Sequence, residues 1–200
     1  MLMLLLQCMK ELENKIIKEG KILEGDILRI DNFLNHQIDT KFLDEIGKEF
    51  YRLFKDCKPE KILTIEASGI AIACATARYF DYIPVVFGKK NMALNLAGET
   101  YVASVISYTR NATYNIRVAK DYLRSDDRVL ILDDFLANGE AIRGLIDICN
   151  EAGCIVVGCG AVVSKSYQSG EKRIKDLGYD VKALARIKSL KDGIIEFEEE

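Results

Sequence analysis

The feature that most constrains the fold is a run of four aliphatic residues at 129–132, which two aspartates follow directly. An unbroken aliphatic run is typical of a strand buried on both faces, as in parallel sheets. A short segment through Asn138 and Gly139 then leads into a helix that we expect to end near Gly153. The sequence therefore predicts an α/β fold in which helices flank a mostly parallel sheet.

The two aspartates, Asp133 and Asp134, are expected at the carboxyl edge of this sheet, where open α/β sheets bind ligands. Two carboxylates can accept hydrogen bonds from neighbouring hydroxyls, and the helix start after Gly139 offers N–H groups and about +0.5 charge to a phosphate. A ribose 5-phosphate carries both a diol and a phosphate, so it matches both parts. The plainer alternative is a strand end with polar helix caps. A P-loop is excluded, because no Gly-Lys-Ser/Thr follows.

Strand and helix patterns alternate through the rest of the chain, which favours a parallel sheet with right-handed crossovers. Leu12, Ile16 and Ile17 are expected to form the apolar face of an N-terminal helix. We expect further helices at 40–55, 70–80 and 170–177, and further strands at 61–65, 83–87, 154–163, 181–187 and 193–197.

Four polar segments directly follow predicted strands, so a parallel sheet would bring them to one edge. Each has a plain explanation by itself, such as a turn glycine, solvated lysines or a helix cap. Together they predict one site for a polyanion, because Gly69 lets backbone N–H groups approach an anion and the lysines add positive charge. These segments are 66–69, Lys89 with Lys90, 133–141, and Lys165.

Two other segments have open interpretations. Residues 27–30 predict a short strand, and the amide-rich residues after it are not expected to be helical. This region can grip a flat heterocycle, or it is a turn with capping amides. Residues 91–113 contain one arm of a hairpin, at 101–109, and residues 115–118 form the other arm. The hairpin is either an active-site lid or a plain surface hairpin.

Composition excludes several classes of protein. A net charge of -3 and a pI near 5.4 argue against a nucleic-acid binder. Six scattered cysteines without a Cys-x-x-Cys pair predict buried free thiols in a reducing cytoplasm, and a single histidine disfavours a zinc site. Residues 1–8 are apolar but far shorter than the roughly 20 residues of a membrane span. We interpret residues 1–8 as a non-native N-terminal extension or a frayed end.

From Met9 onward the chain resembles the xanthine phosphoribosyltransferases, a branch of the type I purine/pyrimidine phosphoribosyltransferase superfamily. The segment 129–141 specifies the superfamily, and residues 31–39 with 133–139 specify the branch. The other residues that carry the resemblance are 66–70, Leu28 and 164–166. The resemblance implies one domain over 9–200, with a small N-terminal/C-terminal hood that takes in about 9–39 and the C-terminal segment. It also implies transfer of a 5-phosphoribosyl group to xanthine, Mg²⁺ as cofactor, and a homodimer serving purine salvage.

The resemblance also implies a role for each site residue. Asp133 and Asp134 would hold the ribose hydroxyls as catalytic residues, with magnesium nearby and bound indirectly. The 5-phosphoribosyl 1-pyrophosphate would contact Ala67, Ser68, Gly69, Lys90, Ala137, Asn138, Gly139, Glu140 and Ala141. In the family the contact near Ala67 often involves a strained or cis peptide. Xanthine would contact Leu28, Asn35, Phe135 and Lys165.

The chain departs from relatives of this superfamily at two positions. Lys89 replaces the arginine of an Arg-Lys pair but keeps its charge. Ala137 stands where hypoxanthine–guanine enzymes have an aspartate proposed as the base, so catalysis would rest on electrostatics. Two alternatives stay open: an enzyme of this fold that uses adenine, hypoxanthine or guanine, and a ligand-sensing regulator. The regulator would need a basic helix-turn-helix, for which the first 25 residues are too few and too mixed in charge.

Overall fold

A six-stranded sheet forms the centre of the computed structural model, which describes residues 2–23, 27–90, 98–107, 112–191 and 193–199. All neighbouring strands are parallel except β10 and β9, which are antiparallel. The predicted α/β class is therefore confirmed. From one edge to the other, the strands are β10 (Ile194–Phe197), β9 (Val181–Lys191), β8 (Ile155–Lys165), β7 (Arg128–Leu136), β3 (Lys61–Ile65) and β4 (Val85–Gly88).

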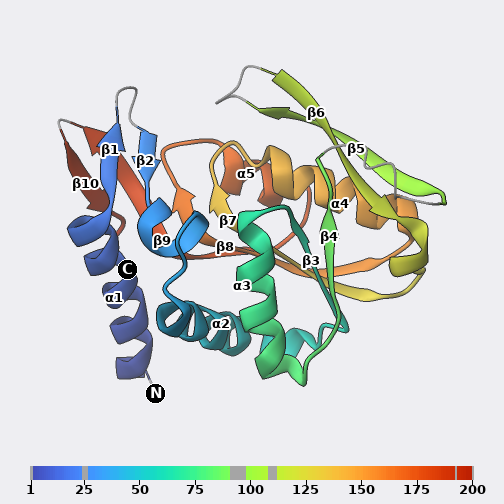
Figure 1. Ribbon diagram of the computed structural model, residues 1–200, viewed down its shortest axis with the longest axis horizontal. Coiled ribbons are helices and arrows are strands. Elements are labelled where there is room, and N and C mark those ends of the chain that lie inside the picture. The colour runs from blue at the N-terminus through green and yellow to red at the C-terminus, as the bar shows by residue number, and fades with distance from the viewer. Residues whose placement is uncertain (1, 24–26, 91–97, 108–111, 192, 200) are drawn as a thin grey trace.

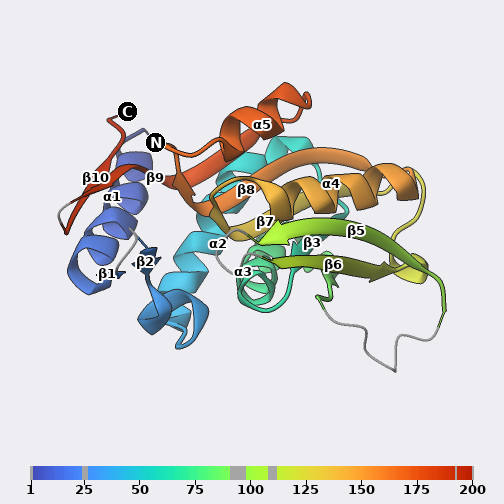
Figure 2. The same cartoon turned by 90° about the horizontal axis from the view of Figure 1, so that it is seen from above.

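Helices cover both faces of this sheet (Figures 1 and 2). One face carries α2 (Thr40–Phe54) and α3 (Ser68–Ala77), and the other carries α4 (Glu140–Ala152) and α5 (Gly170–Asp176). Alternate residues of β7 point to opposite faces of the sheet and pack against the two helix layers. Leu130 and Leu132 are fully buried in the cluster with α2 and α3, whereas Val129 and Ile131 are fully buried in the cluster with α4. The aliphatic run thus forms a strand covered on both faces, as expected.

Glycines in β8 allow α2 to pack closely on the sheet. A Cβ atom at Gly158 would lie 2.7 Å from Cε1 of Phe54, and one at Gly160 would lie 2.9 Å from Cε1 of Phe50. Both phenylalanine rings are fully buried. The aromatic face of α2 therefore needs these two positions to have no side chain.

The N-terminal part of the predicted hood, called the hood from here on, lies beside the C-terminal strands β9 and β10 (Figure 1). It contains α1 (Leu2–Glu19), the antiparallel strands β1 (Lys21–Leu23) and β2 (Ile27–Arg29), and a π-helical turn, Asp31–Asn35. Leu12 and Ile16 are buried in one cluster with Leu184, Ile187 and Leu190, which belong to β9. The hood thus packs on the sheet through apolar side chains.

Two predictions about the hood are wrong. Ile17 is 58% exposed, because its position lies about 100° around the helix from Ile16, away from β9. Residues 31–35 do form a helical turn, although asparagines disfavour helices. Burial of Phe33 and Leu34, each 1% exposed, stabilises the turn, and the carbonyl of Asp31 accepts hydrogen bonds from two later N–H groups.

The predicted hairpin is confirmed in its two arms, β5 (Thr100–Ser107) and β6 (Ala112–Ala119). Val105 and Ile116 are fully buried against α4, where a Cβ atom at Gly144 would lie 2.6 Å from Cγ2 of Val105. The arms thus rest on the helix layer. Residues 91–97 and 108–111 of the predicted lid lie outside the described residues.

The cysteines match the prediction only in part. Cys149 and Cys159 are free and buried, and burial raises the pKa of the Cys149 thiol and raises that of Cys159 to about 12. Cys74 is exposed, because it lies on the outer side of α3. No helix in the described residues combines the length and the apolar character that crossing a membrane requires.

Candidate active site

Asp133 and Asp134 lie within β7, which continues past them to Leu136. Asp133 is only 4% exposed, and its Oδ1 accepts a hydrogen bond of 2.9 Å from the backbone N–H of Asp134. Burial and the negative charge of Asp134 raise the pKa of the Asp133 carboxyl well above its usual value, and the positive charge of Lys90 opposes this shift. Two neighbouring carboxylates, one of them desolvated, form a centre that favours positive charge or hydroxyl donors.

The hood reaches this acidic pair through Asn35. The Nδ2 of Asn35 donates a hydrogen bond of 2.8 Å to Oδ2 of Asp134. Asn35 ends the π-helical turn, so the burial of Phe33 and Leu34 in that turn positions the amide. The amide predicted to contact a base and the carboxylate predicted to hold a sugar therefore lie in direct contact.

The turn after β3 passes close to the acidic pair. It begins with a cis peptide bond between Glu66 and Ala67, the geometry that the resemblance implies. A Cβ atom at Gly69 would overlap Oγ1 of Thr64 and would lie 3.7 Å from Oδ1 of Asp133. Only glycine fits here, and its backbone lies beside the buried carboxylate.

The segment after β4 is joined to this turn. The backbone N–H of Lys90 donates to Oε1 of Glu66 at 2.6 Å, and Lys89 exchanges two backbone hydrogen bonds of 2.9 Å with Arg117 of β6. The Nζ of Lys90 lies 5.6 Å from the centre of the Tyr114 ring. These contacts hold the ammonium group of Lys90 near the acidic pair, which is consistent with the effect of Lys90 on the pKa of Asp133.

The segment from Ala137 to Ala141, for which phosphate binding is expected and which is therefore called the phosphate loop, runs from the end of β7 into the first turn of α4. Gly139 has a φ of +81°, and α4 begins at the next residue, as predicted. The first N–H groups of a helix have no partner inside it, so they can donate to an anion at the carboxyl edge of the sheet. Sequence reasoning missed two residues that contact this loop, Gly170 and Arg173 of α5. No local motif marks them.

The remaining residues predicted to contact the base lie on β2, β7 and β8. Leu28 is buried in the cluster that also contains α2 and α3, and Phe135 is half-buried against that cluster. Lys165 is half-buried and ends β8, one residue beyond Ser164, which pairs with Leu136 of β7. The structure thus brings Phe135 and Lys165 to the same edge.

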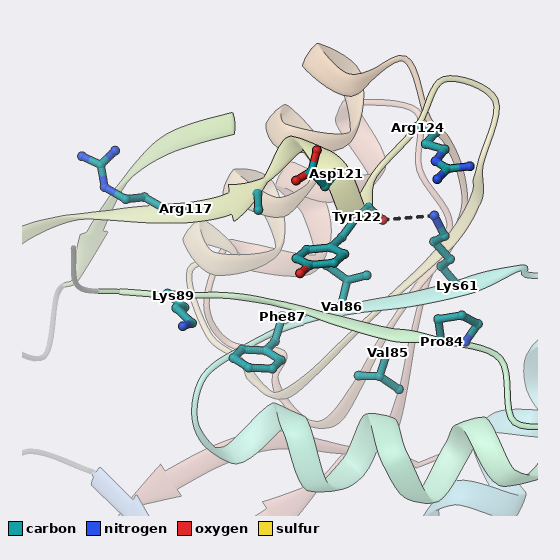
Figure 3. Close-up of a pocket in the computed structure, with 11 residues that line it drawn as sticks. Lys61, Pro84, Val85, Val86, Phe87, Lys89, Arg117, Asp121, Tyr122 and Arg124 are labelled. Atoms are coloured by element: carbon teal, nitrogen blue, oxygen red, sulfur yellow. Dashed lines mark hydrogen bonds between the residues drawn. The ribbon is translucent and has the colours of Figure 1, made fainter. Parts of the chain in front are cut away.

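A hollow of about 690 Å³ lies elsewhere, along the outer edge of β4 (Figure 3). Phe87 and Tyr122 lie along it, and Nζ of Lys61 donates to the carbonyl of Tyr122 at 3.0 Å. Of the segments predicted to form the polyanion site, it shares only Lys89. The hollow is therefore distinct from the edge that carries the acidic pair.

The described residues hold no group of three or more His, Cys, Asp or Glu side chains that could hold a metal ion. The acidic pair supplies two carboxylates. Mg²⁺ commonly uses one or two carboxylates and takes its other ligands from substrate phosphates and water. The chemistry of this donor set therefore fits a magnesium ion that arrives with a phosphorylated substrate.

The fold, the acidic pair and the glycine-led helix start define a class of enzymes that handle phosphoribosyl groups. The family model of the phosphoribosyl transferase domain matches residues 31–192, and the chain belongs to this family. A xanthine phosphoribosyltransferase of Clostridium perfringens is 52% identical over 94% of this chain and 100% of its own length. One from Laribacter hongkongensis is 50% identical over the same shares.

Solved structures confirm the fold. The adenine phosphoribosyltransferase of Rhodothermus marinus superposes with a TM-score of 0.74 at 21% identity, covering 90% of this chain and 99% of the other. The adenine phosphoribosyltransferase of Trypanosoma brucei gives 0.75 at 16% identity, covering 90% and 81%. At these identities the likeness concerns the fold alone.

Proposed function

We propose that the protein transfers the 5-phosphoribosyl group of 5-phosphoribosyl 1-pyrophosphate to xanthine, which gives xanthosine 5′-monophosphate and pyrophosphate. The observation that carries the proposal is the contact between Asn35 and Asp134, because it joins the amide proposed to read the base to the carboxylate proposed to hold the sugar. The full-length similarity to enzymes named xanthine phosphoribosyltransferase supports the choice of base.

The phosphorylated substrate would span the carboxyl edge of the sheet. Asp133 and Asp134 accept hydrogen bonds from the ribose hydroxyls, and N–H groups of the phosphate loop, residues 137–141, bind the 5′-phosphate. The pyrophosphate lies against Ala67, Ser68 and Gly69, with Lys90 neutralising part of its charge. The proximity of Gly69 to Asp133 supports this arrangement, since it brings these two subsites together.

Xanthine would lie between the hood and the sheet. An amide side chain has two N–H donors and one carbonyl acceptor, and the bond to Asp134 uses one donor of Asn35. The second donor and the carbonyl suit the oxo group and ring N–H of a purine. Lys165 donates to an exocyclic oxygen, Phe135 packs on the ring, and Leu28 closes the hood over it.

The reaction needs no nucleophilic side chain. A purine ring nitrogen bonds to C1 of the ribose as the bond from C1 to the pyrophosphate oxygen breaks, and the pyrophosphate leaves with the electron pair of that bond. The proton of the purine ring N–H passes to water. Ala137 has no group that can accept this proton. Positive charge that develops on the ribose is stabilised by the acidic pair, an electrostatic contribution that is often the largest in enzymes. A base that ionises readily by itself, such as xanthine, suits this site.

Magnesium fits the site through Asp133 and Asp134, which would hold the ion mainly through the substrate and water. When bound, the ion would neutralise the charge of the pyrophosphate as it leaves. A homodimer and a location in the cytoplasm also belong to this proposal. They rest on the resemblance to the family and on the unpaired cysteines.

The test is a panel of bases assayed for kcat/KM across pH. We expect xanthine to be preferred over hypoxanthine at neutral pH, because hypoxanthine lacks the oxo group at position 2 and is less acidic. Raising the pH through the range in which hypoxanthine ionises should reduce the difference in kcat/KM between the two bases. Equal use of both bases at neutral pH would refute both the xanthine assignment and the missing-base argument.

Adenine is the second candidate, since Ala137 is compatible with enzymes that use it. Lys165 argues against adenine, because a lysine donates to an oxo group and cannot accept from an amino group. Guanine and adenine in the same panel decide between the candidates. Higher kcat/KM for adenine than for xanthine would reverse our assignment.

A further inference from the structure

We propose that Arg173 of α5 is a positioning residue for the phosphate loop, residues 137–141. It would hold the loop with the carbonyl groups of Ala137 and Asn138 toward α5, so that the N–H groups of the loop face the 5′-phosphate. This inference rests on the proposed function, which places the 5′-phosphate at this loop. Its role is distinct from that of the loop residues, because Arg173 would act through them and not on the substrate.

Three successive carbonyl groups of the loop accept hydrogen bonds from the protein. The carbonyl of Ala137 accepts from the N–H of Gly170 at 3.0 Å, and that of Asn138 accepts from Nη1 of Arg173 at 3.2 Å. The carbonyl of Gly139 accepts from the N–H of Arg143 at 2.9 Å. Carbonyl oxygens repel a phosphate and N–H groups attract it. Fixing these carbonyls therefore fixes the orientation on which anion binding depends.

The backbone of the loop is in direct contact with the start of α5. A Cβ atom at Gly139 would lie 3.1 Å from Cα of Gly170. A Cβ atom at Gly170 would overlap the carbonyl oxygen of Ala137 and would lie 2.9 Å from the nitrogen of Gly139. A shift of α5 is thus transmitted to the loop, because no flexible side chain separates the two backbones.

Arg173 also neutralises a charge that would oppose phosphate binding. Glu140 lies in the first turn of α4 and is 7% exposed. Its Oε1 accepts from Nη1 of Arg173 at 2.5 Å, and its Oε2 accepts from Nη2 of Arg143 at 2.8 Å. Burial alone would raise the pKa of Glu140, but the two arginines lower it, so the carboxyl is ionised at neutral pH. Without Arg173, Glu140 loses one of its two ion pairs beside the proposed phosphate site.

Removal of Arg173 should leave α5 in place. Ile174 of the same helix is fully buried, and Glu171 is bound by Nε of Arg186 at 3.0 Å. These contacts anchor the helix to the sheet without Arg173. An effect of substitution on phosphate binding can therefore be separated from loss of the helix.

The experiment compares Arg173→Met with Lys172→Met, using ribose 5-phosphate as the probe in calorimetry without a base. Lys172 is the matched control, because it belongs to the same helix but pairs with Asp176 on the exposed side. We expect Arg173→Met to weaken binding by about tenfold or more, the effect of losing a charged hydrogen bond. The control should bind like wild type, since exposed ion pairs contribute little.

Kinetics and rescue give readouts that a merely structural role would not move. In Arg173→Met, KM for 5-phosphoribosyl 1-pyrophosphate should rise as binding weakens, whereas KM for the base should change little. Arg173→Lys should recover part of the affinity, because it restores the charge but not the planar fork. Adding Glu140→Gln to Arg173→Met should also recover part of the affinity, because it removes the uncompensated negative charge of Glu140.

Three results would overturn the inference. The first is equal binding of ribose 5-phosphate by Arg173→Met and Lys172→Met. The second is an equal rise of both KM values. The third is full recovery by Glu140→Gln, since the Asn138 carbonyl has lost its donor in that double variant. Turnover of xanthine by wild type is scored separately, so that an error in the base assignment cannot be mistaken for an error about Arg173.

Discussion

Asn35 and Asp134 are joined by a hydrogen bond of 2.8 Å, although 99 positions separate them in the chain. One belongs to the hood and the other to the central strand of the sheet. Because of this bond, the side chain proposed to read the base is oriented by the side chain proposed to hold the sugar. The proposed base site and the proposed sugar site are therefore joined by one hydrogen bond.

Replacing Asn35 with alanine should narrow the preference for xanthine over hypoxanthine. Hypoxanthine leaves part of the Asn35 amide unpaired, and sites built around a polar group can reject an analogue that lacks it by roughly 10⁴-fold. The exposed position of Asn35 should make the discrimination smaller. The measurement is kcat/KM for both bases, with Asn32→Ala as the control in the same helical turn. An unchanged ratio in Asn35→Ala would remove Asn35 from base recognition.

Replacing both aspartates, with Asp133→Asn and Asp134→Asn, should lower turnover by about 100-fold or more while the protein still unfolds cooperatively. This is the scale for losing a preorganised electrostatic contact. The exposed residues Asp56 and Asp121 provide a control for the loss of two charges, as Asp56→Asn with Asp121→Asn. Near-normal turnover in the first double variant would contradict the assignment of the acidic pair.

Asp133→Asn alone should stabilise the ligand-free protein at neutral and alkaline pH. The raised pKa means that the folded protein holds a proton that the unfolded chain releases above the ordinary value of 3.8. Stability therefore falls as pH rises through the interval up to the folded pKa, by about 1.4 kcal/mol for each unit of the shift. The variant should lose this dependence and match wild type more closely near pH 4. The measurement is the free energy of unfolding by denaturant across pH, for wild type and Asp133→Asn. A variant that is less stable than wild type at pH 8 would contradict the prediction.

The segment 91–113 should exchange its backbone hydrogens more slowly when 5-phosphoribosyl 1-pyrophosphate and magnesium are bound. A closed lid keeps water from hydrolysing an activated sugar. Hydrogen exchange with and without ligand is the measurement, and peptides from α2 serve as the internal reference. Equal exchange in both states would show that the hairpin is not a lid.

Gly69→Ala should destabilise the fold by about 1–3 kcal/mol, the usual cost of overpacking. The cause is the overlap of the new methyl group with Oγ1 of Thr64, a buried atom that has no hydrogen-bond partner among the described residues. Adding Thr64→Ala should recover part of this loss, with a coupling energy of about 0.5–3 kcal/mol. Additive effects in the double-mutant cycle would show that the two positions do not interact.

The strands that carry the site could be predicted because their signals are local. The strand predicted at 61–65 has the same bounds in the structure. The aliphatic run 129–132 lies inside β7, which is longer than the run at both ends. The short strand predicted at 27–30 is found as β2 (Ile27–Arg29), whereas its three-residue partner β1 is too short for any periodicity. The π-helical turn depends on the burial of Phe33 and Leu34, which overrides the propensities of the asparagines around them.

The residues of the site also divide into those with a local sequence signal and those placed by tertiary packing. Asp133, Asp134 and Gly139 stand together in one segment, so the sequence indicated them directly. Asn35 was placed near the base only by resemblance, and its bond to Asp134 depends on how the hood docks. The contact between Arg173 and Glu140 spans 33 positions and is set by the way α5 starts after β8, which no short motif encodes.

The packing of α1 on β9 has a consequence for biosynthesis. Leu12 and Ile16 are translated early, whereas Leu184, Ile187 and Leu190, against which they are buried, leave the ribosome more than 160 residues later. The strands that carry the acidic pair and the glycine turn are complete well before that point. A nascent chain can thus form the strands that carry the proposed sugar site first, while the face of α1 that packs on β9 stays uncovered, and a ribosome-associated chaperone would shield that apolar face.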